Sequence, residues 1–111
     1  MELTGKTLTD FWIWYLLPEQ RKTYKTDSLL GKENTIKIRF LAMSFAERYG
    51  VFVDFFNSVD IEIGNNYGNV FWVFTKNERY FDAEEWNYLD IDNLKGRNEA
   101  IEKANEIYNA K

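Results

Sequence analysis

The first apolar pattern of the chain predicts an amphipathic helix over residues 8–17. Its apolar side chains recur three and four positions apart, the spacing of one helical face: Leu8, Phe11, Trp12, Tyr15 and Leu16. Thr4 or Thr7 can cap the start of this helix, and Pro18 either ends it or opens a further turn. Three more apolar residues lie off this stripe, namely Ile13, Trp14 and Leu17. The helix is therefore apolar on nearly every side.

Residues 19–35 are mostly polar and lack periodicity, which predicts a long connection. A second apolar stripe follows and predicts one helix from about Ile38 to Asn57, with the stripe running through Leu41, Phe45, Tyr49, Phe52, Phe56 and Val59. Gly50 lies inside this helix, and we expect it at a close packing contact because an interior glycine weakens a helix. The alternative divides the segment at Gly50 and makes residues 51–56 a strand.

Strand patterns replace the helical spacing after residue 58. Residues 59–63, VDIEI, alternate between apolar and polar side chains. Residues 70–75, VFWVFT, are almost wholly apolar, which is typical of a central strand covered on both faces. Turn-forming residues separate these two segments, and a short strand at 79–81 completes an antiparallel meander.

The last predicted element is a helix that begins between Asn93 and Arg97. Its inner stripe consists of Arg97, Ile101, Ala104 and Tyr108. The predicted fold class is α+β: a small antiparallel three-stranded β-meander packed against about three α-helices, in the order α-α-β-β-β-α. The 111 residues fit a single domain, 1–111, without a linker or an internal repeat.

The composition is that of an aromatic-rich globular chain without His or Cys. Phe, Trp and Tyr make up 18% of the residues, so rings must supply much of the core. The chain has no Cys and no His, which removes disulfides, the commonest zinc ligands and the commonest general base. We therefore predict no enzymatic activity, no catalytic residue and no cofactor.

The net charge of the chain and the length of its longest apolar segment limit which partners and which cellular compartments are expected. The net charge of −4 argues against general nucleic-acid binding, and the basic residues between 21 and 39 are expected to lie in a solvated loop. The longest apolar run, Phe11 to Leu17, is far shorter than the roughly 20 residues of a membrane-spanning helix. No signal-peptide pattern is present, so we expect a cytoplasmic protein.

Two groups of residues, one acidic and one rich in glycine, are candidate ligand sites. An acidic cluster near the end of the predicted sheet is a possible contact surface: Asp82, Glu84, Glu85, Asp90 and Asp92. Its spacing lacks the oxygen ligands and glycine of a calcium loop, so we predict no metal and a solvated surface. Gly64 and Gly68 follow one strand and precede another, which favours a hairpin turn over a phosphate-binding loop.

The surplus of apolar faces predicts an interface with a second protein. Trp12 is expected in the core, whereas five residues are expected to contribute to the interface: Ile13, Trp14, Leu17, Phe71 and Val73. Two other interpretations stay open. The 19–35 connection can fold over the first helix, or all of these side chains can be core.

Three stretches together resemble a family of small uncharacterised proteins from phages and prophages of intestinal anaerobic bacteria: LTGK at 3–6, YGVFVDFFNSV at 49–59 and AIEKANEIYN at 100–109. The family has no established activity, so the resemblance assigns no functional residue. It implies a small accessory protein that acts inside a bacterial cell.

The leading functional hypothesis is a non-enzymatic, phage-type accessory protein that acts through protein–protein contacts. Its expected partner is a second copy of the chain, in a homo-oligomer, or a host or phage protein. Neither a membrane nor a small molecule is implied. The alternative is an acidic inhibitor of a host nucleic-acid-processing or defence system, in which residues 78–92 imitate phosphates.

Overall fold

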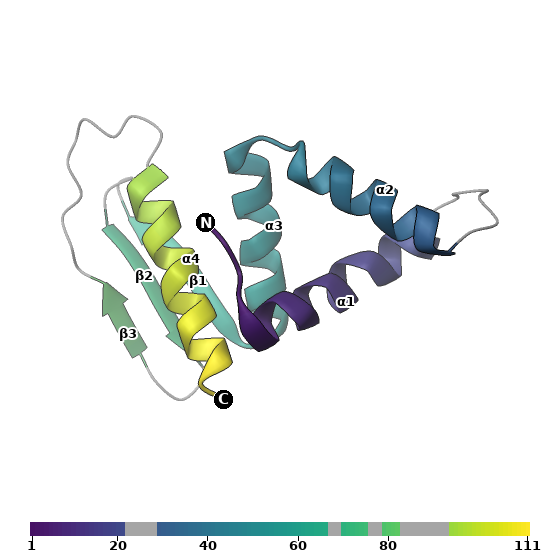
Figure 1. Cartoon of the computed structure of the whole chain (residues 1–111). Helices are drawn as coiled ribbons and strands as arrows, with labels where there is room; N and C mark the ends of the chain where they lie inside the picture. Colours follow the sequence, from purple (N-terminus) through teal and green to yellow (C-terminus); the bar gives the residue numbers. More distant parts are fainter. Residues whose placement is uncertain (22–28, 67–69, 76–78, 83–93) are drawn as a thin grey trace.

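The computed structural model (Figure 1) describes the backbone at residues 1–21, 29–66, 70–75, 79–82 and 94–111, and the side chains at residues 1–16, 33–65, 71–75 and 94–111. Its elements, in chain order, are α1 (Gly5–Arg21), α2 (Leu29–Leu41), α3 (Phe45–Ser58), β1 (Ile61–Asn66), β2 (Val70–Thr75), β3 (Arg79–Asp82) and α4 (Leu94–Asn109). The predicted α+β class is confirmed. The described part of the chain contains four helices, one more than predicted.

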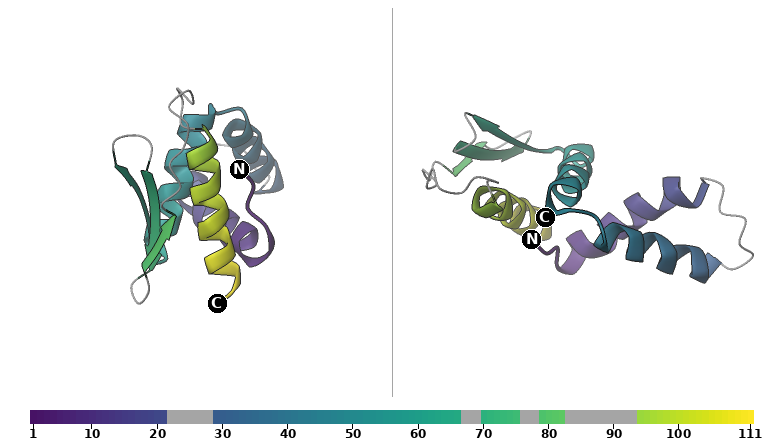
Figure 2. Two further views of the ribbon diagram at one scale, coloured as in Figure 1. Left: turned by 90° about the vertical axis from the view of Figure 1, so that its left-hand side faces the viewer. Right: turned by 90° about the horizontal axis from the view of Figure 1, so that it is seen from above.

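The strands pair antiparallel in the order β1-β2-β3, and helices cover one face of the sheet. Figure 2 shows α3 and α4 lying together on this face. Alternate strand residues point toward the helices and are 8% exposed or less: Ile61, Ile63, Phe71 and Val73. The inner stripe predicted for α4 is confirmed at its three apolar or aromatic positions, Ile101, Ala104 and Tyr108, which are all buried.

A two-helix arm, formed by α1 and α2, projects away from the sheet (Figure 2). The chain measures 50 × 32 × 20 Å along its principal axes, and its radius of gyration is 15.4 Å. A compact domain of this length has a radius of gyration of about 13 Å. The arm therefore exposes more helix surface than a compact arrangement of the same elements.

The start of the arm is attached to the body by an aromatic cluster centred on Phe11 of α1. This ring is 1% exposed. It contacts three rings of its own helix and three from α2 and α3: Trp12, Trp14, Tyr15, Phe40, Phe52 and Phe55. The centroid distances are 5.0 to 6.0 Å, the range of favourable edge-to-face and offset contacts.

The prediction of one helix over residues 38–57 is wrong. The chain breaks between α2, which ends at Leu41, and α3, which begins at Phe45. Ser44 caps α3: its side chain accepts a hydrogen bond from the Glu47 backbone N–H at 3.2 Å and donates one to the Glu47 carboxylate at 3.0 Å. This Ser-x-x-Glu arrangement supplies partners at the helix start and so stabilises the break.

The long polar connection predicted at 19–35 is much shorter. Helix α1 continues through Pro18 to Arg21, and α2 begins at Leu29, which leaves residues 22–28 between the described elements. The two helices lie next to each other as an antiparallel pair (Figures 1 and 2). One interpretation left open above was that the 19–35 connection folds over α1. Residues 29–35 of that connection belong to α2, a helix that lies beside α1.

The prediction for Gly50 is half confirmed. Gly50 lies within α3, so residues 51–56 are helical and the strand alternative is wrong. The expected close contact is absent, because a Cβ atom built at Gly50 meets no heavy atom within 4 Å. The close approaches occur at two other glycines: a Cβ at Gly96 would lie 2.3 Å from the Phe71 ring, and one at Gly64 would lie 2.1 Å from the Trp72 ring.

Candidate functional site

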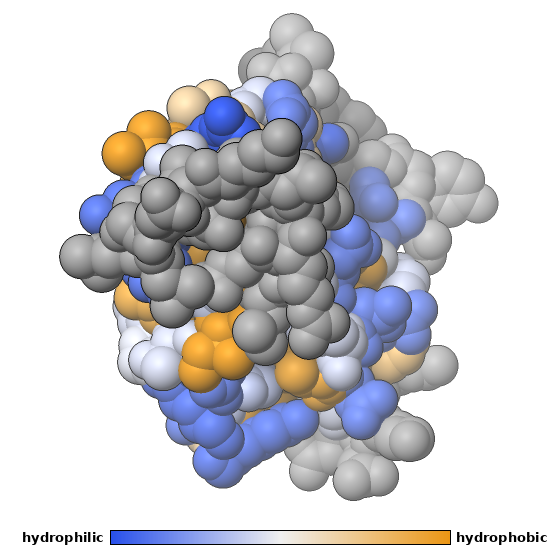
Figure 3. Space-filling model, turned by 90° about the vertical axis from the view of Figure 1, so that its right-hand side faces the viewer, coloured by the Kyte–Doolittle hydropathy of each residue, from blue (hydrophilic) through white to orange (hydrophobic). Residues whose placement is uncertain are grey.

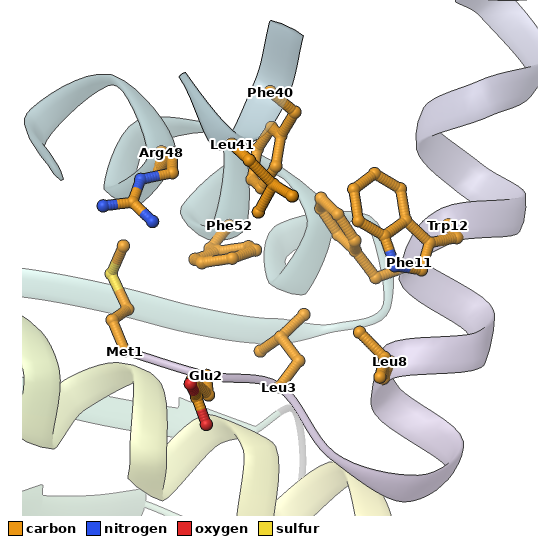
Figure 4. A pocket seen from close by; sticks show the side chains of 10 residues that line it. All are labelled: Met1, Glu2, Leu3, Leu8, Phe11, Trp12, Phe40, Leu41, Arg48 and Phe52. Carbon is orange, nitrogen blue, oxygen red and sulfur yellow. The ribbon is translucent and has the colours of Figure 1, made fainter. Parts of the chain in front are cut away.

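The candidate site is an apolar groove of about 340 Å³ at the base of the arm (Figure 4). Four segments of the chain surround it: the N-terminal segment, α1, the end of α2 and the first half of α3. Its lining consists of Met1, Glu2, Leu3, Leu8, Phe11, Trp12, Phe40, Leu41, Arg48 and Phe52. The groove exists because the break at residues 42–44 turns α3 away from α2, while the N-terminal segment runs across the open side (Figure 1).

The floor and the rim of the groove differ in exposure. Phe11, Phe40 and Phe52 are between 1% and 5% exposed and belong to the core. Leu8 and Leu41 are 39% and 63% exposed. An apolar ligand in the groove can thus remove rim surface from water while it contacts a rigid aromatic floor.

Arg48 is the one cationic side chain of the groove lining. It precedes Phe52 by one helical turn, so both side chains lie on the same face of α3. The Arg48 Nε atom is buried and has no hydrogen-bond partner among the described residues. In Figure 4 the guanidinium lies beside Met1, at the end of the groove opposite Trp12, and the Glu2 carboxylate points away from it. A buried donor without a partner costs free energy that an incoming acceptor can recover.

The N-terminal segment is held in place by α4. Asn105 Oδ1 accepts a hydrogen bond from the Thr4 backbone N–H, and Asn109 Oδ1 accepts one from the Thr7 backbone N–H, both at 3.0 Å. The Asn109 amide also donates to the Thr4 carbonyl at 3.0 Å. Gly5 has a φ of 57°, a left-handed conformation that glycine adopts without strain. These contacts anchor the chain at Thr4, directly after residues 1–3, which form one wall of the groove.

A second link between α1 and α4 joins Tyr108 to Asp10. The Tyr108 hydroxyl donates a hydrogen bond to the Asp10 carboxylate at 2.5 Å. This hydrogen bond, together with burial and the negative charge of Asp10, raises the pKa of Tyr108 from 10.0 to about 12. Lys6 lies over the same ring, with its Nζ 5.2 Å from the centroid. The link strengthens the attachment of the arm to the body and leaves Tyr108 neutral at physiological pH.

This raised pKa predicts a loss of stability at high pH. Below pH 10, Tyr108 is protonated in both states and its full contribution is present. Between pH 10 and 12 the unfolded chain releases a proton that the folded chain retains, so the free energy of unfolding falls. Denaturant unfolding of the wild type and Tyr108→Phe, measured from pH 8 to 12, is expected to show a steeper decline for the wild type. Parallel curves would contradict the prediction.

The sequence-predicted interface residues do not form one surface. Ile13 is 57% exposed, whereas Trp14 is half-buried and lies 5.5 Å from the Phe55 ring. Phe71 and Val73 are 2% and 1% exposed, so both are core residues of the single chain. The side chain of Leu17 lies outside the described residues.

The opposite face of β2 carries the outward-facing rings instead. Trp72 and Phe74 are half-buried and stack with centroids 4.7 Å apart. Gly64 pairs with Trp72 across the sheet and leaves space for its ring. Phe71 turns inward because α4 presents Gly96 at the contact, where a larger residue would collide. Both faces of this strand are aromatic, so the alternation alone did not reveal which face is buried.

The predicted acidic contact surface lies outside the described side chains: Asp82, Glu84, Glu85, Asp90 and Asp92. Of these residues only Asp82 has a described backbone, as the last residue of β3. Among the residues that the structure describes, no group of three or more acidic side chains is placed to hold a metal ion. Within the same ranges, none of the helices combines the length and apolar character that a membrane crossing requires.

No protein-family model, curated protein or solved structure matches the chain. The groove could not be predicted from the sequence, because the apolar spacing places Leu41 in the buried stripe of a single helix. One sequence feature that bears on the groove is Arg48, a charged residue that lies beside the apolar stripe, one helical turn before Phe52.

Proposed function

We propose that the chain is a non-enzymatic accessory protein that acts through protein–protein contacts, with the two-helix arm as its contact surface. One observation carries this proposal. Five large apolar side chains are exposed among the described residues, and four of them lie on α1 and α2: Leu8, Ile13, Ile38 and Leu41, against Leu94 on α4. Apolar side chains gathered on one projecting element are typical of protein interaction sites.

The geometry of the arm favours self-association. A projecting helix pair can pack against the same pair of a second copy, in the self-complementary arrangement of a twofold dimer. Ile38 and Leu41 are three residues apart and therefore neighbours on one face of α2. Their exposed fractions, 67% and 63%, are the largest of the exposed apolar side chains. In Figure 3, which views the molecule from the side of the arm, the visible hydrophobic residues lie among hydrophilic ones. A contact surface of this mixed character fits a reversible dimer better than an obligate one.

The resemblance to phage and prophage proteins supports a role inside a bacterial cell, and we propose a cytoplasmic location on that basis. The alternative function, an acidic inhibitor that imitates nucleic acid, depends on residues 78–92. The side chains of this segment lie outside the described residues, so the structure adds no support to that alternative.

Sedimentation at several protein concentrations tests the proposal. We expect a concentration-dependent dimer, and we expect Ile13→Glu or Ile38→Glu to weaken it about tenfold or more, because charged residues are costly at an apolar contact. Leu94→Glu is the matched control, since Leu94 is also exposed but lies on α4. A chain that is monomeric at every concentration and captures no host or phage protein would overturn the proposal.

A further inference from the structure

The groove has the size and lining of a small-molecule site. Its volume of about 340 Å³ lies within the roughly 300–1,000 Å³ of typical ligand pockets. In Figure 4 the side chains of Leu3, Leu8 and Leu41 approach the same space as the rings of Phe11 and Phe52. The contacts available to a ligand there are almost entirely apolar. A flexible apolar body, such as a short alkyl chain ending in a ring, has the right chemistry for this part of the groove.

Arg48 determines which end group such a ligand carries. Neither a hydrogen bond nor an ion pair joins its guanidinium to any other described residue, and its Nε is buried. A guanidinium offers several N–H donors in a planar fork that matches a carboxylate. Glu2 also lines the groove, but its carboxylate points away from Arg48 and the side chain is exposed (Figure 4). The charge at the Arg48 end is thus uncompensated within the groove.

We infer that this groove binds a small carboxylate with an apolar body, such as an arylalkanoate. The carboxylate lies at Arg48, and the apolar body extends over Phe52 toward Phe11 and Trp12. Leu8 and Leu41 close over the body at the rim. The groove shares Leu8 and Leu41 with the exposed apolar residues of the arm, but Ile13 and Ile38, the two positions substituted in the dimer test above, do not line it.

Titration with phenylbutyrate and with the uncharged phenylbutanol tests the assignment, because the two probes share an apolar body and differ in the end group. Binding is followed by calorimetry and by the backbone and Trp12 indole signals in NMR spectra. We expect phenylbutyrate to bind about tenfold more tightly, the effect of one hydrogen bond to a charged group. Arg48→Gln should abolish this preference while both probes still bind, and Arg48→Lys should retain part of it because the charge remains.

Lys111→Gln is the control, since Lys111 is exposed and does not line the groove. It should leave the preference unchanged. Circular dichroism of each variant checks that the fold is retained. Equal affinities for the two probes, no saturable binding, or signal changes confined to residues away from the groove would each overturn the inference. If the wild type is monomeric but binds phenylbutyrate at Arg48, the proposed dimer is wrong and the carboxylate site stands.

Discussion

Truncation of Phe11 to alanine is expected to lower the free energy of unfolding by about 3–5 kcal/mol, the usual cost of removing a buried ring. Phe11 is 1% exposed and contacts aromatic residues of α1, α2 and α3. Its loss leaves a cavity at the point where the arm joins the body. Because the surrounding rings are held by three different helices, they cannot all move in to fill it.

Chemical denaturation of Phe11→Ala measures this loss, and Ile13→Ala is the control on the same helix. Ile13 is 57% exposed, so its truncation should change stability by less than about 0.5 kcal/mol. Phe11→Leu keeps most of the volume and should fall between the two. A Phe11→Ala variant as stable as Ile13→Ala would show that the aromatic cluster does not support the fold.

Substitution of Gly96 by alanine should destabilise the chain by about 1–3 kcal/mol, the typical cost of overpacking a core. The added Cβ would lie 2.3 Å from the Phe71 ring, closer than atoms can approach, so α4 or the ring must move. The same substitution at Gly50 should have the opposite effect on the free energy of unfolding. Gly50 is exposed inside α3 with no heavy atom near its Cβ position, and alanine there should stabilise the chain by about 0.5–1 kcal/mol.

Thermal or denaturant unfolding of both variants tests this pair. A second substitution, Phe71→Leu, should recover part of the loss in the Gly96→Ala background, because the smaller side chain makes room for the new methyl group. If Gly96→Ala proved neutral, or if Gly50→Ala were the more harmful change, the packing of α4 on the sheet would differ from the one described.

Local spacing predicted the parts of the fold that depend on a single element. The α+β class, the alternating pattern of β1 and the buried stripe Ile101, Ala104 and Tyr108 all follow from periodicity within one segment. The break before α3 was missed because the apolar spacing of four from Leu41 to Phe45 continues across it. The Ser44–Glu47 capping pair marked the break in the sequence, and its signal outweighs the apolar stripe.

Structural features that depend on the packing of two or more helices or strands could not be predicted from the residue spacing within one segment. The alternation of residues 70–75 separates two aromatic faces but does not show which one meets the helices. That choice depends on the glycine at 96 in one distant segment and the glycine at 64 in another. The groove likewise forms from four segments that meet only in the folded chain. Sequence therefore indicated which residues were apolar, whereas packing determined which of them remained accessible.

The hydrogen bonds that join Thr4 and Thr7 to Asn105 and Asn109 connect positions about a hundred residues apart. Such a separation makes loop closure entropically costly, and it delays the contact until most of the chain is present. During synthesis, α4 is the last of the described elements to be made. Until then Phe71 and Val73 lack their helical cover, and the start of α1 lacks its partners. We therefore expect a late, concerted step in which α4 docks, covers the sheet and fastens the N-terminal segment in one event.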